Sequence, residues 1–568
     1  MKVVLINPPQ IFSQYQVGIG VTPPLGIAYL AAYCLKWGID VEIVDSVGEA
    51  PDTVAPFREE IFLRGLRIGD IVERISQDVG LIGISNLFSF AYPAVRELAN
   101  AIRAAHPDKP VVLGGAHPTH MYAEVLEHGS ANFVVIGEGE IPLLELCRNL
   151  GGEIALEDVP SLAYRDGNGQ VQETDIAPRI KDLDSQNIPY PARHLLPMEN
   201  YIAAQEAHGA TSGRWTSLIT SRGCPYGCTF CDIRRTKWVA RSARDVVDEM
   251  ELCYGQWGIK EFHFEDDNMT LRRERLFEIC DEIINRGLRI KWQTPNGIRA
   301  SVTDELMLRK MKESGCIHIT LAPESGSERV IREIIQKGKD YSHEQLLEIG
   351  RAAHKMGMKV AAYFILGMPG EKPEDVQQTI GYAKRLAKAG VDEAGFQLLI
   401  PLPGTPVWEH VVEEYGQPDY LDLLVVGDLN KAVSWSPHLA AEQLSSYRRR
   451  AYMTFQFYRA VYHPRSFVRT ILNVLRGMAE TKTENYMRMF IKHLRLSWRR
   501  ATPKSGRFSG RAELAGYTPY AGERSVFVLL QTTAHYAFSN SGLKAALMVL
   551  RDFGSWLRGM RLPKKVAK

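Results

Sequence analysis

Long apolar runs are missing from this chain of 568 residues. No uninterrupted stretch approaches the roughly 20 apolar residues that a membrane-spanning helix needs. The start, MKVVLINPPQ, also lacks the basic segment and long apolar core of a secretory signal, because a short strand-like run leads straight into two prolines. We therefore expect a cytoplasmic protein whose eight cysteines are thiols or metal ligands rather than disulfides.

A strong compositional bias is missing as well. Apolar residues make up 45% of the chain and charged residues 24%, which is typical of globular proteins and excludes a disordered, collagenous or coiled-coil chain. Because a domain usually holds roughly 100–200 residues, the length predicts three or more domains.

Residues 1–150 alternate between short runs rich in Val and Ile and helical patterns. The runs lie at 2–6, 41–45, 81–85, 111–115 and 133–137, and the helical patterns include 28–37, 93–105 and 141–150. This alternation predicts an α/β fold with a doubly wound parallel sheet, which binds ligands at the carboxyl ends of its strands. No G-x-G-x-x-G follows the first run, which disfavours a dinucleotide. The stretch 50–70 is interpreted as an insertion.

Residues 151–212 are predicted to form a linker, in which RDGNGQ (165–170) signals a hairpin turn. Alternation resumes over residues 213–415. Candidate strands there lie at 216–221, 261–266, 290–294, 317–321, 359–366 and 395–400. Six such units predict a partial (β/α)6 barrel of the TIM type, and such barrels carry their chemistry at the C-terminal ends of the strands.

The remaining region, 416–568, is predicted to be basic and mainly helical. Residues 441–568 hold 24 Lys and Arg against 6 Asp and Glu, a charge of +18, whereas the preceding 440 residues carry −16. Helical patterns cover 439–478 and about 543–560, with a polar basic loop at 497–511. Such a block indicates an anionic partner: a membrane surface, an acidic substrate or nucleic acid. A solvated helical face is the alternative.

The most specific motif is CPYGCTFC (224–231), which directly follows the first strand of the predicted barrel. Thiolates are the ligands of iron–sulfur clusters, and Cys224, Cys228 and Cys231 can hold three irons of a 4Fe-4S cluster. No fourth cysteine lies nearby in the sequence, which leaves one iron open to a substrate or cofactor. The alternatives are three unligated thiols or a zinc site, although structural zinc prefers four protein ligands and only His263, on another strand, offers a fourth.

This loop resembles the signature of the radical S-adenosylmethionine (SAM) enzymes, and further segments match that family in order. They are the aromatic residue before the third cysteine, the acids that end the second strand, ESG (324–326), FILGMPGE (364–371) and PLPGTP (401–406). The resemblance implies that SAM contacts come from Phe230, Glu265, Asp266, Glu324, Ser325, Leu366 and Gly367. For the acids and Ser325, capping of the next helix is the alternative.

The first domain resembles that of the cobalamin-binding subclass of the family. NPP near the start, TPPLGIAYLAA (22–32), GGAHPT (114–119) and GEGE (137–140) carry this likeness. It implies cobalamin contacts from Pro8, Pro24, Leu25, Ser85, Asn86, Gly114, Gly115, His117, Pro118, Thr119, Gly137, Glu138 and Gly139. Many cobalamin proteins carry a cobalt-ligating histidine in D-x-H-x-x-G, but this chain reads DSVG (45–48) there. For His117, a loop histidine satisfied by the backbone is the alternative.

The resemblance implies an enzyme that uses a 4Fe-4S cluster, SAM and cobalamin to methylate an unactivated carbon of a small molecule or lipid. The cluster and SAM generate a 5′-deoxyadenosyl radical, and the cofactors perform the difficult chemistry. No residue is assigned a catalytic role. The first alternative is cyclisation, ring contraction or C–C coupling with the same cofactors. The second is a cobalamin or nucleic-acid binding module with a structural cluster.

The partners follow from the resemblance and from the charge. The family implies an electron donor of the flavodoxin or ferredoxin type. The basic C-terminal region predicts peripheral contact with the inner face of a membrane. Nucleic acid is the least favoured partner, because no recognition motif accompanies the basic residues.

Overall fold

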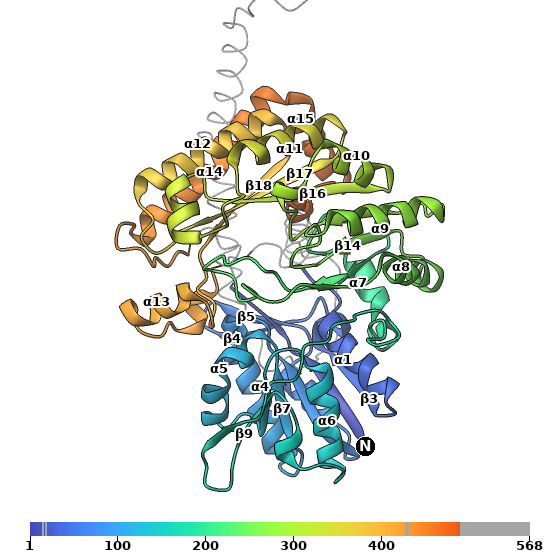
Figure 1. The fold of residues 1–568 in the computed structure, drawn as a ribbon. Coiled ribbons are helices and arrows are strands. Elements are labelled where there is room, and N and C mark those ends of the chain that lie inside the picture. Colours follow the sequence, from blue (N-terminus) through green and yellow to red (C-terminus); the bar gives the residue numbers. More distant parts are fainter. Residues whose placement is uncertain (14–15, 17–19, 426–430, 489–568) are drawn as a thin grey trace, which may run out of the picture. The chain divides into compact units, whose positions relative to one another are not determined.

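The first sheet contains seven strands in the order β10-β9-β8-β7-β6-β1-β3. It lies in the N-terminal part of the ribbon, coloured blue to cyan, where β3, β7 and β9 are labelled (Figure 1). The structure is a computed structural model, and it describes residues 1–13, 16, 20–425 and 431–488. All five predicted strands form and pair in parallel, in the doubly wound order whose direction reverses between β1 and β6. The strands are β1 (Lys2–Asn7), β3 (Asp40–Asp45), β6 (Val79–Ser85), β7 (Val111–Gly114), β8 (Phe133–Val135), β9 (Leu162–Arg165) and β10 (Val171–Glu173).

Both faces of this sheet are covered, which explains why its strands are apolar throughout. Val3 and Leu5 of β1 pack in one cluster with α1 and α6, whereas Val4 and Ile6 pack on the other face with α3, α4 and α5. The helices are α1 (Leu25–Lys36), α3 (Ile68–Glu73), α4 (Tyr92–Ala105), α5 (Ala116–Glu127) and α6 (Glu140–Leu150).

Two segments outside the predicted strands add β-structure. The RDGNGQ turn forms as expected, since Asp166 accepts hydrogen bonds from the backbone N–H groups of Asn168 and Gln170. Its hairpin, β9–β10, is not a free linker, because β9 pairs antiparallel with β8 and extends the sheet. The stretch around 50–70 supplies two of three antiparallel strands: β2 (Gln10–Ser13), β4 (Val54–Arg58) and β5 (Ile61–Arg64).

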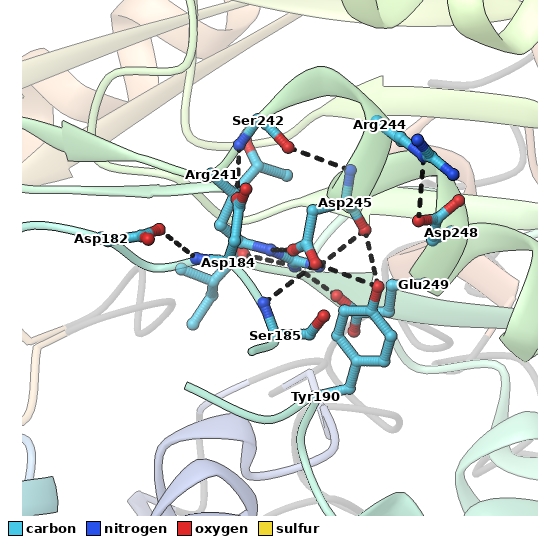
Figure 2. Close-up of polar contacts among 12 residues, drawn as sticks. Asp182, Asp184, Ser185, Tyr190, Arg241, Ser242, Arg244, Asp245, Asp248 and Glu249 are labelled. Atoms are coloured by element: carbon cyan, nitrogen blue, oxygen red, sulfur yellow. Dashed lines mark hydrogen bonds and ion pairs between the residues drawn. The ribbon is translucent and has the colours of Figure 1, made fainter. Parts of the chain in front are cut away.

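Residues 184–190 of the predicted linker are hydrogen-bonded to the start of the first helix of the barrel, α8 (Ala243–Trp257), and to the residue before it (Figure 2). The backbone N–H of Ser242 donates to Asp184, and that of Ser185 donates to Asp245. The Tyr190 hydroxyl also donates to Asp245. Shorter elements follow along the linker, namely η3 (Arg193–Leu195) and α7 (Met198–Ala204).

The second sheet has six parallel strands in chain order, as a partial barrel requires. The predicted strands all form, with ends shifted by a few residues. They are β11 (Trp215–Leu218), β14 (Glu261–Phe264), β15 (Lys291–Thr294), β16 (Cys316–Glu324), β17 (Lys359–Leu366) and β18 (Glu393–Leu398). Between them lie α8, α9 (Arg273–Asn285), α10 (Glu305–Glu313), α11 (His343–Lys355) and α12 (Pro373–Ala389).

The two faces of this sheet differ in chemistry. Phe364 of β17 and Phe396 of β18 stack on each other. They contact Tyr382 of α12 and Tyr452 of α14 (Ala441–Tyr462), so this face carries the helices. Alternate residues of the same strands point the other way, toward the inside of the partial barrel. On that inner face a side chain at Gly395 would collide with the ring of Tyr363.

Beyond the barrel, the described chain is helical as predicted. Its helices include α13 (Pro406–Tyr415), α14 (Ala441–Tyr462) and α15 (Pro464–Arg476). The predicted loop at 497–511 and helix at 543–560 lie outside the described residues. Among the helices that the structure describes, none combines the length and apolar character needed to cross a membrane.

Candidate active site

The cysteine loop is closed at its base by a two-stranded ribbon. β12 (Ser221–Arg222) pairs antiparallel with β13 (Val239–Ala240), so residues 223–238 form a loop beyond the end of β11. Cys224 is tied across this loop to Thr236, whose hydroxyl accepts from the Cys224 N–H at 2.9 Å. Gly223 has φ +86°, and a Cβ there would lie 2.6 Å from the carbonyl oxygen of Lys237, so the turn requires glycine.

The three loop thiols fit a cluster with one open iron. Cys224, Cys228 and Cys231 are half-buried free thiols. The other five cysteines are buried: four lie in helices, and Cys316 is the first residue of β16, at the end of the strand opposite to the cysteine loop. Burial raises the pKa of Cys231 to about 12, and the neighbouring Cys228 and Cys224 contribute to the rise. In the described part of the chain no three His, Cys, Asp or Glu side chains are placed to hold one metal ion. A 4Fe-4S cluster does not require three ligands around one metal ion, because each thiolate binds a different iron.

The acids after β14 have different surroundings. Asp266 is buried and accepts three hydrogen bonds, from the N–H and hydroxyl of Thr220 and from the hydroxyl of Ser221. Asp267 accepts from the N–H of Gly223 at 2.7 Å, and burial raises its pKa to about 6. Both carboxylates therefore brace the start of the cysteine loop, which favours a structural role for Asp266 over a contact with SAM.

Glu265 is the better placed acid for an ammonium group. Its Oε2 lies 3.1 Å from Nδ1 of His208, and its buried Oε1 has no hydrogen-bond partner among the described residues. Burial raises the pKa of Glu265, but His208, with smaller contributions from His263 and Lys482, outweighs this effect and holds the pKa below its ordinary value. An ionised carboxylate with one unused oxygen fits the amino group of a bound amino acid.

The segments after β16 and β17 lie at the same edge of the sheet. Glu324 has φ +59° and forms an ion pair with Lys337 at 2.5 Å, while the Ser325 hydroxyl lies 3.1 Å from that of Thr379. After β17, Glu371 accepts hydrogen bonds from the N–H groups of Gly367 and Met368. Burial raises the pKa of Glu371 to about 8, and its other carboxyl oxygen lacks a described partner.

The remaining residues predicted to contact SAM differ in exposure. Leu366 is buried at the end of β17, and Phe230 is partly buried beside the cysteines. SAM contacts by Phe230, Glu265, Asp266, Glu324, Ser325, Leu366 and Gly367 remain predictions.

The carboxyl edge of the first sheet gathers most of the residues predicted to contact cobalamin. The N–H of Asn86 donates to the carbonyl of Gly114, and that of Gly137 donates to the hydroxyl of Thr119. Gly115 has φ +115°, and a Cβ there would lie 2.5 Å from the carbonyl oxygen of Asn86. This close approach brings the loops after β6, β7 and β8 together.

Two large apolar side chains stand exposed at this edge. Leu87 is 59% and Phe88 52% exposed, and the Phe88 ring stacks on Phe90. Exposed apolar groups side by side are typical of a surface that a ligand covers. Together with the glycine loops, this surface fits the broad, largely apolar face of a corrin ring.

Other residues of this edge are enclosed. His117 is 1% exposed, its ring packs against Tyr92 and Tyr420, and burial lowers its pKa to about 3. Its partner is the hydroxyl of Ser89 rather than a backbone group, and this position favours a packing role over a corrin contact. Leu25 and Pro118 are also buried, Pro8 and Pro24 are partly exposed, and cobalamin contacts at this edge remain predictions.

The segment that lacks the histidine of other cobalamin proteins has a structural role. Asp45 is fully buried and accepts hydrogen bonds from Asn7, from the N–H of Gly48 and from the hydroxyl of Tyr201. It thereby caps the short helix α2 (Ser46–Glu49) and connects it to α7.

Arg222 connects the two candidate cofactor edges. It forms ion pairs with Glu140 at 2.6 Å and with Glu138 at 3.8 Å, and its guanidinium lies over the ring of Tyr29. Arg222 stands two positions before Cys224, whereas Glu138 and Glu140 belong to the loop and helix after β8. The start of the cysteine loop is therefore held against the carboxyl edge of the first sheet.

Sequence reasoning missed two residues inside the partial barrel, His208 and Lys482. His208 precedes β11, and Lys482 lies far along the chain, with its ammonium 5.6 Å from the ring centre of Tyr363 and 5.8 Å from that of Tyr486. In the described chain no carboxylate lies within ion-pair distance of Lys482. No local pattern marks either residue, because long stretches of sequence separate them from Glu265.

Comparisons with known proteins agree with this arrangement. The sequence profile of the radical SAM superfamily matches residues 218–383, and that of the B12 binding domain matches residues 19–147. The cytidylyl-2-hydroxyethylphosphonate methyltransferase of Streptomyces wedmorensis is 32% identical over 446 residues, which cover 73% of this chain and 82% of that protein. The anaerobic magnesium-protoporphyrin IX monomethyl ester cyclase of Rubrivivax gelatinosus is 26% identical over 464 residues, or 80% of this chain and 78% of the cyclase.

The same fold occurs in a solved structure. The radical SAM methyltransferase TsrM of Kitasatospora setae, solved with cobalamin and a [4Fe-4S] cluster, superposes with a TM-score of 0.58. The two chains are 20% identical, and the match covers 79% of this chain and 84% of TsrM. The fold and the site thus define an enzyme that pairs a cluster-bearing partial barrel with a cobalamin domain. This chain belongs to the radical SAM superfamily, in the group with a B12-binding domain, and its cofactors are a 4Fe-4S cluster, SAM and cobalamin.

Proposed function

We propose that this enzyme methylates an unactivated carbon of a small-molecule or lipid substrate. The observation that carries the proposal is the three-thiol loop, which has no fourth described cysteine nearby and which Arg222 holds against the edge of the B12-binding domain. When bound, the cluster and SAM supply a radical that activates carbon, and cobalamin supplies a transferable methyl group.

The chain's own residues bind and orient these groups. Cys224, Cys228 and Cys231 hold the cluster, and the unused oxygen of Glu265 accepts the ammonium group of SAM. The exposed apolar pair Leu87 and Phe88 would pack against bound cobalamin and exclude water from it.

Isotope labelling tests this function. The holoenzyme, purified without oxygen and reduced, is incubated with SAM that carries a CD3 group and with a metabolite extract from a host strain that lacks the gene. We expect 5′-deoxyadenosine and a product that carries deuterium. A Cys231→Ser variant should form neither, whereas Cys280→Ser, buried in α9, should form both.

The same experiment separates the alternatives. The likeness to the magnesium-protoporphyrin cyclase favours cyclisation as a second candidate. A new product without deuterium would support cyclisation, ring contraction or C–C coupling and would exclude methylation. Failure of the wild-type holoenzyme to form 5′-deoxyadenosine would instead favour a binding module with a structural cluster.

We also propose peripheral contact with an anionic membrane surface, through α15. Its outward residues include Val468, Ile471 and Leu475, which are 52%, 47% and 69% exposed, with Arg465 and Arg476 beside them on the same helix. An apolar ridge with flanking arginines is typical of a helix that lies in a lipid interface.

Liposome flotation tests this contact. The wild-type protein should float with vesicles that contain phosphatidylserine, and Leu475→Glu should reduce the floating fraction severalfold. Met453→Glu on α14, which changes another strongly exposed apolar residue, serves as the matched control and should float like the wild type. Wild-type protein that stays with the soluble fraction at low salt would contradict the proposal.

An electron donor of the flavodoxin or ferredoxin type completes the proposed function. Cleavage of SAM should proceed with the reduced flavodoxin of the host and should stop when that protein is left out. A rate that does not depend on added flavodoxin or ferredoxin would contradict this choice of donor.

A further inference from the structure

A hollow of 740 Å³ lies at the end of the second sheet opposite to the cysteine loop. Its inner wall is formed by residues at the starts of the parallel strands, among them Glu261 of β14, Lys291 of β15 and Lys359 of β17. Glu265 and Leu366 stand near the other ends of these strands. The hollow is therefore separate from the site described above, and its volume suits a ligand of moderate size.

The outer wall of the hollow comes from the C-terminal part of the described chain. Residues of α15 and the segment 477–480 line it, together with Arg488. His318 of β16 belongs to its lining, is 4% exposed and has a buried Nδ1 without a described hydrogen-bond partner. The opposite ring nitrogen of His318 lies 3.3 Å from Glu393.

Every acid that lines the hollow already has partners. Asp392 pairs with Lys359, and Glu480 pairs with Lys359 and Arg469. Glu261 accepts hydrogen bonds from Ser212 and Gln293. None of these carboxylates is therefore left to neutralise a further cation.

Besides Lys291, which donates to the hydroxyl of Ser212, three cations around the hollow have no acidic partner in the described chain. The side chains of Lys312 and Arg465 make no hydrogen bond or ion pair with another described residue. Arg488 donates only to uncharged oxygens, the carbonyl of Gln205 and the amide of Asn485. These cations come from α10, from α15 and from the segment after α15, so the fold brings unbalanced positive charge to one place.

We propose that this hollow binds the phosphate group of a small phosphorylated ligand, and that Lys312, Arg465 and Arg488 hold that group. A phosphate monoester carries a charge of about −1.5 to −2, which three cations can balance. Guanidinium groups match the geometry of phosphate oxygens, and two of the three cations are arginines. A soluble phosphate compound and a phospholipid headgroup share this chemistry.

Calorimetric titration of the full-length holoenzyme tests the proposal with two probes, inorganic pyrophosphate and dihexanoyl phosphatidic acid. At least one probe should bind, more weakly as salt is added. Tighter binding of pyrophosphate would identify a soluble phosphate compound, and tighter binding of the lipid would identify a headgroup. Lys312→Met and Arg465→Met should each lower the affinity for the probe by about tenfold, which is the usual effect of losing one hydrogen bond to a charged group.

Lys310→Met provides the matched control. Lys310 lies on the same helix as Lys312, but it is paired with Asp281 and does not line the hollow. This variant removes the same charge and should bind the probe like the wild type. The proposal is wrong if neither probe binds, if the Lys312 and Arg465 variants bind as tightly as the wild type, or if Lys310→Met weakens binding equally. Formation of 5′-deoxyadenosine, measured on the same samples, reports separately on the proposed methyltransferase.

Discussion

Glu249 holds two buried arginines beside the segment that leads into the cysteine loop. Its carboxylate is fully buried and pairs with Arg193 at 2.6 Å. It also pairs with Arg241 (Figure 2). Arg193 in turn donates to the carbonyl of Ser217 at 2.8 Å, and Arg241 donates to that of Ile219. Replacing Glu249 by Gln leaves two guanidinium groups around a neutral amide, whose NH2 group faces one of them.

The contacts of Glu249 set the loss of stability that we expect for Glu249→Gln. Breaking a buried ion pair by removing one partner costs about 3–5 kcal/mol. Because Arg241 keeps its second partner, Asp245, we expect the lower end for Glu249→Gln, about 3 kcal/mol. The barrel (213–415) has about 200 residues, and for a domain of that size each kcal/mol of lost stability lowers Tm by roughly 2–4 °C. Tm should therefore fall by about 6–12 °C.

Thermal unfolding followed by circular dichroism, under anaerobic conditions, measures this change. Asp248→Asn is the control, because Asp248 lies one position away on the same helix but is 42% exposed, with its surface partner Arg286. An exposed pair contributes at most about 1 kcal/mol, so this variant should melt within a few degrees of the wild type.

The two variants together test whether the buried carboxylate of Glu249 stabilises the fold. If Glu249→Gln melts together with the wild type and Asp248→Asn, the buried carboxylate does not stabilise the fold. Iron content supplies a second readout, since a loosened segment 217–220 should also lower cluster retention in Glu249→Gln.

Three further predictions concern the cofactor site. Cys231→Ser should lose most of its iron and acid-labile sulfide, whereas Cys280→Ser should keep the wild-type content. Glu265→Gln should weaken SAM binding by about tenfold in equilibrium dialysis, and unchanged affinity would remove Glu265 from the SAM site. Burial raises the pKa of Glu371 to about 8. Between about pH 4.3 and pH 8 the folded protein therefore keeps a proton on Glu371 that the unfolded chain has released. The free energy of unfolding consequently falls as the pH rises through this range. The Tm of Glu371→Gln relative to the wild type should therefore increase from about pH 5 to about pH 8, and a constant difference would contradict the shifted pKa.

Most strands of both sheets were predictable, because buried parallel strands leave a local signature of consecutive Val and Ile. The position of the β9–β10 hairpin was not. Its turn is encoded in RDGNGQ, but its pairing with β8 depends on which edge of the first sheet is free, and that is a property of the whole sheet. Local sequence predicts a turn more readily than its distant partner.

The candidate site shows the same division. The cysteine ligands follow from their spacing, since the chain between them is short. The adjacent acids Glu265 and Asp266 cannot be told apart in sequence, because their roles depend on the direction in which each side chain points. The structure turns Asp266 toward Thr220 and Ser221 and leaves Glu265 with one unused oxygen. Lys482 enters the barrel from a segment that no motif connects to it.

The β9–β10 hairpin has a practical consequence for dissecting this enzyme. A fragment cut after residue 150 would present β8 as an exposed outer strand, with main-chain donors and acceptors ready to recruit a second molecule and aggregate. In a fragment that extends past Glu173, the β9–β10 hairpin covers the edge of β8. Its own outer strand, β10, is a poor template for pairing, because it is only three residues long and ends in the exposed polar pair Gln172 and Glu173. Expression of the cobalamin-binding half alone should therefore succeed only when these later residues travel with it.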